Sequence, residues 1–440
     1  MCNHDFSMHN CAIAKVSSYF FHSKASVIST FPKRLFSLVS FLLVFLLLFS
    51  FSVIPLEFCH AVGTPSYWDS RVYPLGLVDE GSSEAGIKGF AQEYGFFSTS
   101  QWTQFAFDLK NGGLVCQANL IQIPGTLLPL TFSLAYSSKN ANVDIGLGKG
   151  WMTNLHSCVS EDVQTHDLTY ITPTGAKMVF EYDSQTSSYS NPKSFTGLAK
   201  ENQDGTYTIQ TLDGQIATFS SNGKLASLSS LTGGLLEVGY DGSGRPETLT
   251  DSKSSREITL TWDVNGILTG AEDMLGNTWS FSYTSSNLTE IQQPSDDVPD
   301  PDIHTTFGYD ANHMLTSQVD FEGFEYEITY HSSGYQANKV ATFVEPTENA
   351  ATSEFTYQED QEGYDKKTTL TDGENRNTYY YFSDTTEHLM KTSMVNNTTV
   401  LKTEYEYNAL GLVSTISDSY DKETTLTYDD VGHIETITYP

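Results

Sequence analysis

Four residues near the start of the chain are of the types that bind zinc. They are Cys2, His4, His9 and Cys11, in the segment CNHDFSMHNC. Zinc sites usually pair ligands two to four residues apart and separate the pairs by a longer loop, whereas this segment is short throughout. It also lies before a hydrophobic segment typical of export signals. We therefore predict that the chain holds no metal and no cofactor.

The other candidates for chemistry are carboxylates and histidines, whose spacing is not typical of catalysis. With 54 Asp and Glu residues, some pairs lie at glycosidase separation by chance, and repeated Asp residues already serve in turns. Acidic turns such as Asp429-Asp430 lack EF-hand spacing and are predicted to be solvated. No H-x-x-x-H pair and no G-x-S-x-G elbow occurs, and the histidines beyond the export segment are His156, His166, His304, His313, His331, His388 and His433. We expect no enzymatic activity, and a glycoside hydrolase is the weakest alternative.

The charge of the chain limits its partners. Its 440 residues carry 23 Lys and Arg against 54 Asp and Glu, a net charge of −31. Binding to a phosphate backbone or an anionic membrane surface needs clustered cations, so we predict no nucleic-acid partner. With 39% hydrophobic and 13% aromatic residues, the chain is too apolar to be disordered, and we expect most of it to fold.

A run of twenty uncharged residues extends from Leu35 to Ile54, after two cations. Such a run is long enough to span a membrane and also fits the hydrophobic part of a signal peptide. Cys59 and Ala61 place small residues at positions −3 and −1 of a cleavage site, which favours cleavage over a retained anchor. We predict a basic cytoplasmic leader at 1–34, a signal peptide or signal anchor at 35–61, and export of the rest to the cell surface or the medium.

Two cysteines follow this segment, Cys116 and Cys158. Export permits them to form a disulfide, whose loop of about 42 residues would contribute roughly 3–4 kcal/mol in the chain-entropy model. Two separate buried thiols are an equal alternative, and the sequence leaves both open.

The chain between the export segment and the repeats divides in two. Residues 62–125 scatter Gly, Ser and Pro among aromatics, which predicts an irregular lead-in with short strands. Within 126–205, a β-rich region, Leu127 to Tyr136 alternates as a strand does. The segment GLGKGW that follows does not join a strand to a helix. We interpret it as a tight turn beside a buried Trp151 and not as a phosphate-binding loop.

From residue 206 to 440, an aromatic residue followed by Asp or another polar residue recurs every 21 to 27 residues. A period of this size over ten copies is typical of repeat architectures, in which each unit buries its face against its neighbours. The ten landmark aromatics are Phe219, Tyr240, Trp262, Tyr283, Tyr309, Tyr330, Tyr357, Tyr381, Tyr407 and Tyr428.

The residues around each landmark alternate as in an antiparallel strand. Phe324, Tyr326, Ile328 and Tyr330 form one apolar face, and the residues between them are polar. The landmark is followed by a turn that begins with Asp or Asn, as at Asp241, and usually ends on Gly. The Asp side chain can bond the backbone two residues on, and Gly accepts a positive φ. We predict an all-β fold with the landmarks in its core.

Several copies of this repeat resemble the tyrosine-aspartate (YD) repeats of the Rhs family, which are shared with teneurins and with the C components of insecticidal toxin complexes. The copies are VGYDGSGRPETLTD, FGYDANHMLTSQVD, YEYNALGLVSTISD and LTYDDVGHIETI. LTFSLAYSS and GLGKGWMTNL also resemble the β-rich region that commonly precedes such repeats. Trp262 replaces Tyr, Tyr283 and Tyr357 lack the Asp, and Tyr381 lies in an atypical TYYYF, so we expect distorted turns in those units.

The resemblance implies a β-sheet strip that curls into a hollow shell, which in the family often encloses a C-terminal toxin domain or forms part of an adhesion receptor. Ten units of two strands make a strip only ~95 Å wide, which closes to a diameter of ~30 Å. A passenger of about 100 residues has a radius of gyration of ~13 Å and would not fit. The self-cleavage region, an Asp-Pro followed by Gly, is also missing, since Asp300-Pro301 is followed by Asp302.

These observations predict an exported, non-enzymatic YD-repeat protein that forms a partial, open shell, as a truncated or N-terminal piece of a cell-surface or toxin-delivery shell. Its expected partners are a cell-surface polysaccharide or protein, or a further part of the shell, and we expect no toxicity of its own. The alternative is a cell-wall carbohydrate-binding or adhesion array, whose aromatics would face outward to stack on sugars. A β-propeller is disfavoured because its G-H…W-D signature is absent.

Overall fold

The structure is a computed structural model, and the described residues all belong to one unit of the chain, Pro65–Pro440. The described ranges are 94–98, 103–125, 127–192, 195, 197–211, 214–294, 303–346, 351–385, 388–396, 399–429 and 432–440, with side chains from residue 105 on except at 396 and 399. The predictions for the leader at 1–34, the segment at 35–61, the zinc-ligand types near the start and Asp300-Pro301 lie outside these residues. Within these ranges no helix is long and apolar enough to cross a membrane.

Strands and turns make up nearly all of the described chain, which confirms the predicted all-β antiparallel class. The helical elements of the described ranges are the short 3-10 turns η4 (Ser138–Asn140), η5 (Asn154–His156) and η6 (Gly334–Gln336). Strand β22 (Glu325–Tyr330) shows why: Tyr326 and Ile328 are buried, while the Glu residues beside them are exposed. Phe324, predicted on the same apolar face, is 45% exposed because it lies in the turn before the strand begins.

The strands form three antiparallel sheets, each a meander in chain order. The first sheet contains β1 (Tyr94–Ser98), β2 (Thr103–Asp108), β3 (Leu114–Ile123), β4 (Leu130–Ser137) and β5 (Trp151–Thr153). The second contains β6 (Cys158–Glu161), β7 (Leu168–Ile171), β8 (Lys177–Asp183) and β9 (Ser188–Ser190). The third sheet, which we call the strip, has 22 strands and holds all ten landmarks.

The first half of the strip contains β10 (Gly197–Glu201), β11 (Tyr207–Thr211), β12 (Gln215–Phe219), β13 (Leu225–Ser230), β14 (Leu235–Tyr240), β15 (Pro246–Asp251), β16 (Glu257–Trp262), β17 (Leu268–Glu272), β18 (Thr278–Thr284), β19 (Asn287–Gln292) and β20 (His304–Tyr309). The second half contains β21 (Leu315–Val319), β22, β23 (Val340–Val344), β24 (Thr352–Gln361), β25 (Tyr364–Thr371), β26 (Asn377–Phe382), β27 (Leu389–Asn396), β28 (Thr399–Tyr407), β29 (Val413–Ser417), β30 (Glu423–Tyr428) and β31 (Ile434–Thr438). Every landmark lies on an even-numbered strand.

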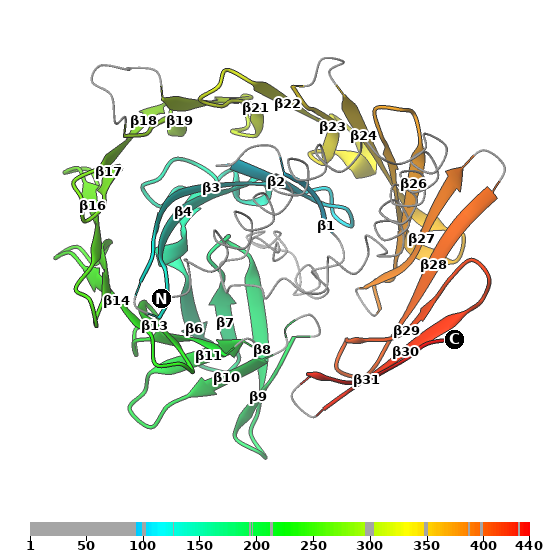
Figure 1. Cartoon of the computed structure of the whole chain (residues 1–440), viewed down its shortest axis with the longest axis horizontal. Coiled ribbons are helices and arrows are strands. Elements are labelled where there is room, and N and C mark those ends of the chain that lie inside the picture. The colour runs from blue at the N-terminus through cyan, green and yellow to red at the C-terminus, as the bar shows by residue number, and fades with distance from the viewer. Residues whose placement is uncertain are drawn as a thin grey trace, which may run out of the picture. The chain divides into compact units, whose positions relative to one another are not determined.

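A β-bulge accompanies most landmarks. At Tyr240, for example, the pairing jumps from Gly239 with Thr248 to Tyr240 with Pro246. The same shift occurs at Phe219, Trp262, Tyr283, Tyr309, Tyr330, Tyr407 and Tyr428. A bulge bends its strand and increases the local twist. Because the bulges recur once per unit and on the same strand of each hairpin, they bend the strip repeatedly in one sense, and Figure 1 shows it curving around the first sheet.

The turns after the landmarks are held by the Asp side chain, as predicted. Asp241 Oδ1 accepts from the N–H groups of Ser243 and Arg245, both at 2.9 Å. Gly244 then adopts φ +79° and donates its N–H to the Asp241 carbonyl. The same pair of side-chain bonds recurs after other landmarks at Asp263, Asp310 and Asn408, and also in the turns that follow odd-numbered strands, at Asp273, Asp320, Asp372 and Asp418.

Two units depart from this pattern, and each has a specific reason. Tyr357 lies inside the long hairpin β24–β25, paired with Thr368 without a bulge. In β26 the shift falls between Tyr381 and Phe382, so that Phe382 takes the landmark position. The alignment on Tyr381 is therefore corrected by one residue. The TYYYF segment offers four adjacent aromatics, Tyr379 to Phe382, and cross-strand pairing sets the face that each one occupies.

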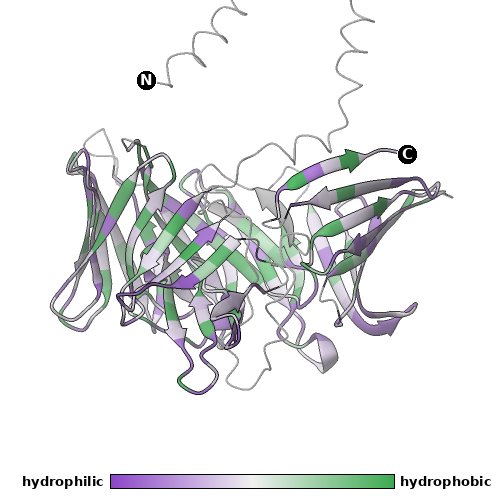
Figure 2. Cartoon of the chain, turned by 90° about the horizontal axis from the view of Figure 1, so that it is seen from below, coloured by the Kyte–Doolittle hydropathy of each residue, from purple (hydrophilic) through white to green (hydrophobic). Residues whose placement is uncertain are grey.

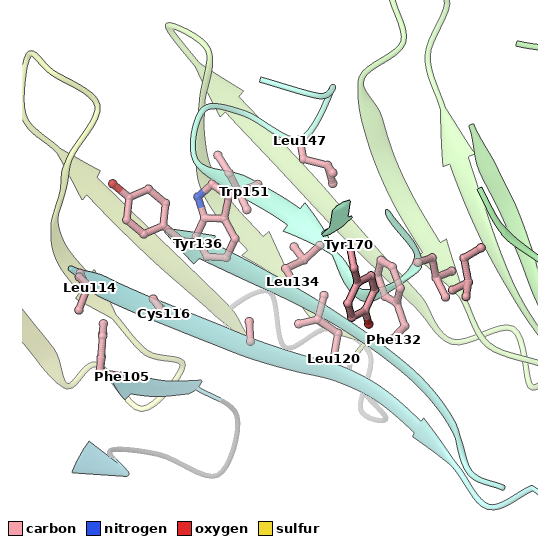
Figure 3. Packing of buried hydrophobic residues seen from close by; sticks show 14 of the residues in the cluster. Phe105, Leu114, Cys116, Leu120, Phe132, Leu134, Tyr136, Leu147, Trp151 and Tyr170 are labelled. Carbon is pink, nitrogen blue, oxygen red and sulfur yellow. The ribbon is translucent and has the colours of Figure 1, made fainter. Parts of the chain in front are cut away.

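The first sheet lies on the concave side of the strip (Figure 1), and Figure 3 shows its buried side chains, among them Phe132 and Tyr136. Strand β3 has ten residues, where the sequence predicted a lead-in with short strands. Its first five residues are buried without a break, so the strand is covered on both faces and shows no alternation of apolar and polar residues. We call residues 105–180 the plug, because they contain most of the buried hydrophobic residues of the first two sheets.

Candidate functional site

The inner face of the strip is a row of buried side chains that pair from strand to strand. Each is at most 9% exposed over most of the repeats, for example Val238, Leu249, Leu260, Ala271, Phe281, Ile291, Phe307, Gln318, Ile328, Phe343 and Phe355. The residues two positions before the landmarks belong to this row, as the alternation predicted. What covers the row is the plug.

Aromatic rings join the plug to the inner face. Phe107 lies 5.0 Å from both Phe343 and Phe355, measured between ring centroids. Trp151 lies 5.0 Å from Phe307 in an edge-on arrangement. Such aromatic pairs add stabilisation beyond the area that they bury. Trp151 is 2% exposed, as the interpretation of GLGKGW predicted, and it lies beside Tyr136 (Figure 3).

Polar groups of the plug complete hydrogen bonds that the bulges leave open. The N–H of Leu315, which begins β21, donates to the Tyr136 hydroxyl at 3.0 Å, and that hydroxyl donates to the His313 carbonyl at 3.0 Å. The N–H groups of Leu268 and Val340 donate to plug carbonyls of Gly146 and Gly112, at 2.8 and 2.9 Å. Burial raises the pKa of Tyr136 well above its usual value, so its hydroxyl stays protonated.

The GLGKGW segment docks by backbone contact. Gly146 and Gly148 have φ of +92° and +79°. A Cβ at Gly146 would lie 2.1 Å from the Gly266 carbonyl oxygen, and one at Gly148 would lie 2.6 Å from the Leu288 nitrogen. These glycines therefore permit a close approach of two backbones and not the binding of a phosphate. Lys149 adds a 2.8 Å contact from Nζ to His313 Nε2.

The landmark side chains link each unit to the preceding one. Six of them donate to the backbone carbonyl of the residue that begins, or nearly begins, an earlier odd-numbered strand, at 2.6–2.9 Å. The pairs are Tyr240 with Leu225, Trp262 with Pro246, Tyr309 with Leu288, Tyr330 with Leu315, Tyr407 with Leu389 and Tyr428 with Val413. These acceptor residues were missed in the sequence, although an aliphatic residue or Pro six positions after most landmarks was a usable signal.

The remaining landmarks lack this bond. Phe219 has no donor and is 0% exposed. The hydroxyls of Tyr283 and Tyr357 are buried without a partner among the described residues. The Tyr381 hydroxyl donates to Glu362 at 3.0 Å, away from the inner row.

Cys116 and Cys158 are both free thiols in the structure, so the two do not form the disulfide that the sequence left open. The Cys116 thiol donates to Gln318 Oε1 at 3.4 Å, which gives the one amide in the inner row a partner from the plug. Burial raises the pKa of Cys116 far above its usual value, which disfavours a nucleophilic thiolate. In the described part of the chain, no group of three or more His, Cys, Asp or Glu side chains is placed to hold a metal ion.

The inner row loses its cover in the last repeats. Tyr405 pairs with Ile416 and Leu426 pairs with Ile437, but the first three of these are only partly buried and Ile437 is 44% exposed. Figure 2 shows hydrophobic positions on these last strands, beside the C-terminus. Among the described residues, the plug thus covers the inner face of the early repeats, while the inner face of the last ones is apolar and only partly buried.

Comparisons with known proteins agree only in part with the resemblance in sequence. Residues 108–180 match a family model described as a domain of unknown function, DUF6531, and this range falls within the plug. No curated protein matches the chain.

Among solved structures, the chain is similar to TcdB2-TccC3 without its hypervariable C-terminal region, with 14% identity, a TM-score of 0.35, and coverage of 76% of this chain and 19% of that one. For TcdB2-TccC3-Cdc42 the values are 13%, 0.36, 81% and 23%. For a mutant Photorhabdus luminescens Tc holotoxin pore they are 14%, 0.36, 76% and 18%. This chain therefore spans less than a quarter of those chains, and we base no conclusion on TM-scores this low.

Proposed function

We propose that this protein is an exported, non-enzymatic shell protein of the YD-repeat type, whose last repeats take up a further apolar β-surface. The observation that carries the proposal is the contrast along one inner row: Phe307 and Ile328 are buried under the plug, while Leu426 and Ile437 are not. The strip is continuous, and its inner face is covered in the early repeats and apolar in the last ones. A further β-surface can therefore pack against the last repeats.

The occupant that fits the last repeats is a further apolar β-surface like that of the plug, from a further part of a shell or from another chain. The row on β28–β31 has the spacing and apolar character of the row that the plug covers, so the same kind of side chains would pack on it. Contiguous apolar surface of this sort is typical of protein contact sites. Carbohydrate binding is less well supported, because most landmark rings donate their polar group to the backbone.

The test is the mass of the full chain in solution, measured by light scattering over a range of concentrations. We expect concentration-dependent association of the native chain. Leu426→Lys, on the open inner row, should return it to a monomer, whereas Thr427→Lys, one residue away on the exposed opposite face, should leave association unchanged. A native chain that stays monomeric at all concentrations, or equal effects of the two substitutions, would contradict the proposal.

A further inference from the structure

Four lysines gather around the turn between β2 and β3, at Asp108–Gly113. Lys110 comes from the turn itself and Lys139 from η4, while Lys339 precedes β23 and Lys366 lies in β25. The Lys139 ammonium donates to the Asn111 carbonyl at 2.9 Å, and that of Lys366 donates to Asn111 Oδ1 at 3.3 Å. In a chain with 23 cationic and 54 anionic side chains, this gathering runs against the overall composition.

Backbone contacts hold these lysines in place from both sides. The N–H of Val340 donates to the Gly112 carbonyl at 2.9 Å, and the Thr368 hydroxyl donates to the Leu109 carbonyl. Gly112 lies so close to Lys339 that a Cβ there would be 2.3 Å from the lysine Cβ. The cluster therefore has a fixed geometry that joins the plug to the strip.

Lys110 and Lys366 share one carboxylate within ion-pair distance, that of Asp384. The Lys110 side chain is 3% exposed, and its nearest carboxylate oxygen is Asp384 Oδ1 at 3.7 Å. The same oxygen receives Lys366 at 3.1 Å, so one carboxylate serves two ammonium groups. The Asp108 carboxylate binds backbone groups of its own turn: its Oδ1 accepts the N–H groups of Lys110 and Asn111. Its Oδ2 is buried with no partner in the described ranges.

A buried ammonium group with three donors and one distant acceptor is costly, and further acceptor oxygens would relieve that cost. The neighbouring Lys339 is also buried beside other cations. Burial lowers the pKa of Lys339 to about 8; the charges of Lys139 and Lys366 add to this effect, and those of Asp108 and Glu359 oppose it.

We infer that this lysine cluster binds a phosphate-type oxyanion beside Asp384. Asp384 is 53% exposed and the Lys366 side chain is 19% exposed, so an ion that displaces the Asp384 carboxylate meets Lys366 from solvent. A tetrahedral oxyanion has enough oxygens to accept from several ammonium groups at once, which a single carboxylate does not. Bound there, the ion would join the plug to the strip and stabilise their contact. The ion is either free phosphate or the phosphate of an ester.

The experiment is thermal unfolding and calorimetric titration of the full chain, with inorganic phosphate in one arm and glycerol 3-phosphate in the other, against chloride at equal ionic strength. Asp384→Asn removes the competing carboxylate, so its melting temperature should fall in chloride and rise more than that of the native chain on adding phosphate. Lys366→Met should bind at least about tenfold more weakly. The control is Lys253→Met, at an exposed lysine far along the strip, which should respond as the native chain does.

Saturable binding in either arm, strengthened by Asp384→Asn and weakened by Lys366→Met, supports the site and identifies the source of the ion. Phosphate also stabilises proteins generally through exclusion from their surface. An equal, non-saturating rise of melting temperature in all four proteins, with no heat of binding, would therefore overturn the inference.

Discussion

The indole N–H of Trp151 donates to the hydroxyl of Tyr309 at 2.8 Å, and that hydroxyl donates in turn to the Leu288 carbonyl at 2.6 Å. Trp151 belongs to the plug and Tyr309 is a repeat landmark. The Tyr309 hydroxyl thus takes part in two hydrogen bonds: it accepts one from the plug and donates one to the preceding unit of the strip. Hydrogen bonds in such a chain polarise one another, so plug docking and repeat stacking should be energetically coupled.

The landmark hydroxyls should contribute to stability only where they have an acceptor. Tyr330→Phe removes a donor bonded to the Leu315 carbonyl at 2.9 Å and should lower the free energy of unfolding by about 1–2 kcal/mol, measured by urea denaturation. Tyr283→Phe is the matched control, because its hydroxyl is buried without a partner, and it should be neutral or stabilising. The opposite order of the two variants would be inconsistent with this role.

The landmark rings should act as core and not as sugar platforms. Tyr330→Ala should cost roughly 3–4 kcal/mol of stability, as large-to-small core changes do. Binding of the folded variant to cell-wall polysaccharide, compared with that of the native chain, is the accompanying measurement. An unchanged melting temperature together with lost polysaccharide binding would favour the carbohydrate-binding alternative.

Gly148→Ala should loosen the plug. Both Gly148 and Gly276 have positive φ, but only Gly148 approaches another backbone, whereas a Cβ at Gly276 would meet nothing within 4 Å. Gly276→Ala should therefore show only the conformational cost of about 1–2 kcal/mol. Gly148→Ala should cost more and should also shift tryptophan fluorescence to the red as Trp151 becomes hydrated. Equal effects of the two substitutions on stability and fluorescence would argue against backbone docking at this loop.

Stability should fall in mild acid because of His156. Burial lowers the pKa of His156 from 6.5 to about 4, and its Nδ1 lies 2.7 Å from the Thr153 hydroxyl. The unfolded chain binds a proton near pH 6.5 and the folded chain only near pH 4, so the unfolded state holds more protons between these values. The neutral His156 therefore contributes fully to the free energy of unfolding above pH 6.5. Up to about 3 kcal/mol of this contribution is lost as the pH falls toward 4.

His156→Gln isolates this effect. The loss of unfolding free energy between pH 7 and 4.5 should be smaller in this variant than in the native chain. Identical pH profiles for the native chain and His156→Gln would remove His156 as the cause.

The repeat and its turns were predictable from sequence because each rests on local chemistry. The Asp241 side chain needs only its own turn to find its partners, and Ile328 shows its burial by alternating with exposed neighbours. The plug was not predictable, since β3 is buried on both faces and its partners lie far along the chain, as with Cys116 and Gln318. The shift from Tyr381 to Phe382 is likewise decided by cross-strand pairing.

The central claim is that the plug covers the inner face of the early repeats and leaves that of the last repeats open. Amide hydrogen exchange of the full chain tests this claim at the first residue of the strand that follows each bulge. The plug accepts the amides of Leu268, Leu315 and Val340, while no described plug group accepts those of Val413 and Ile434. We predict that the first three exchange on the order of 100-fold more slowly than the last two. Equal exchange at all five amides would contradict the account.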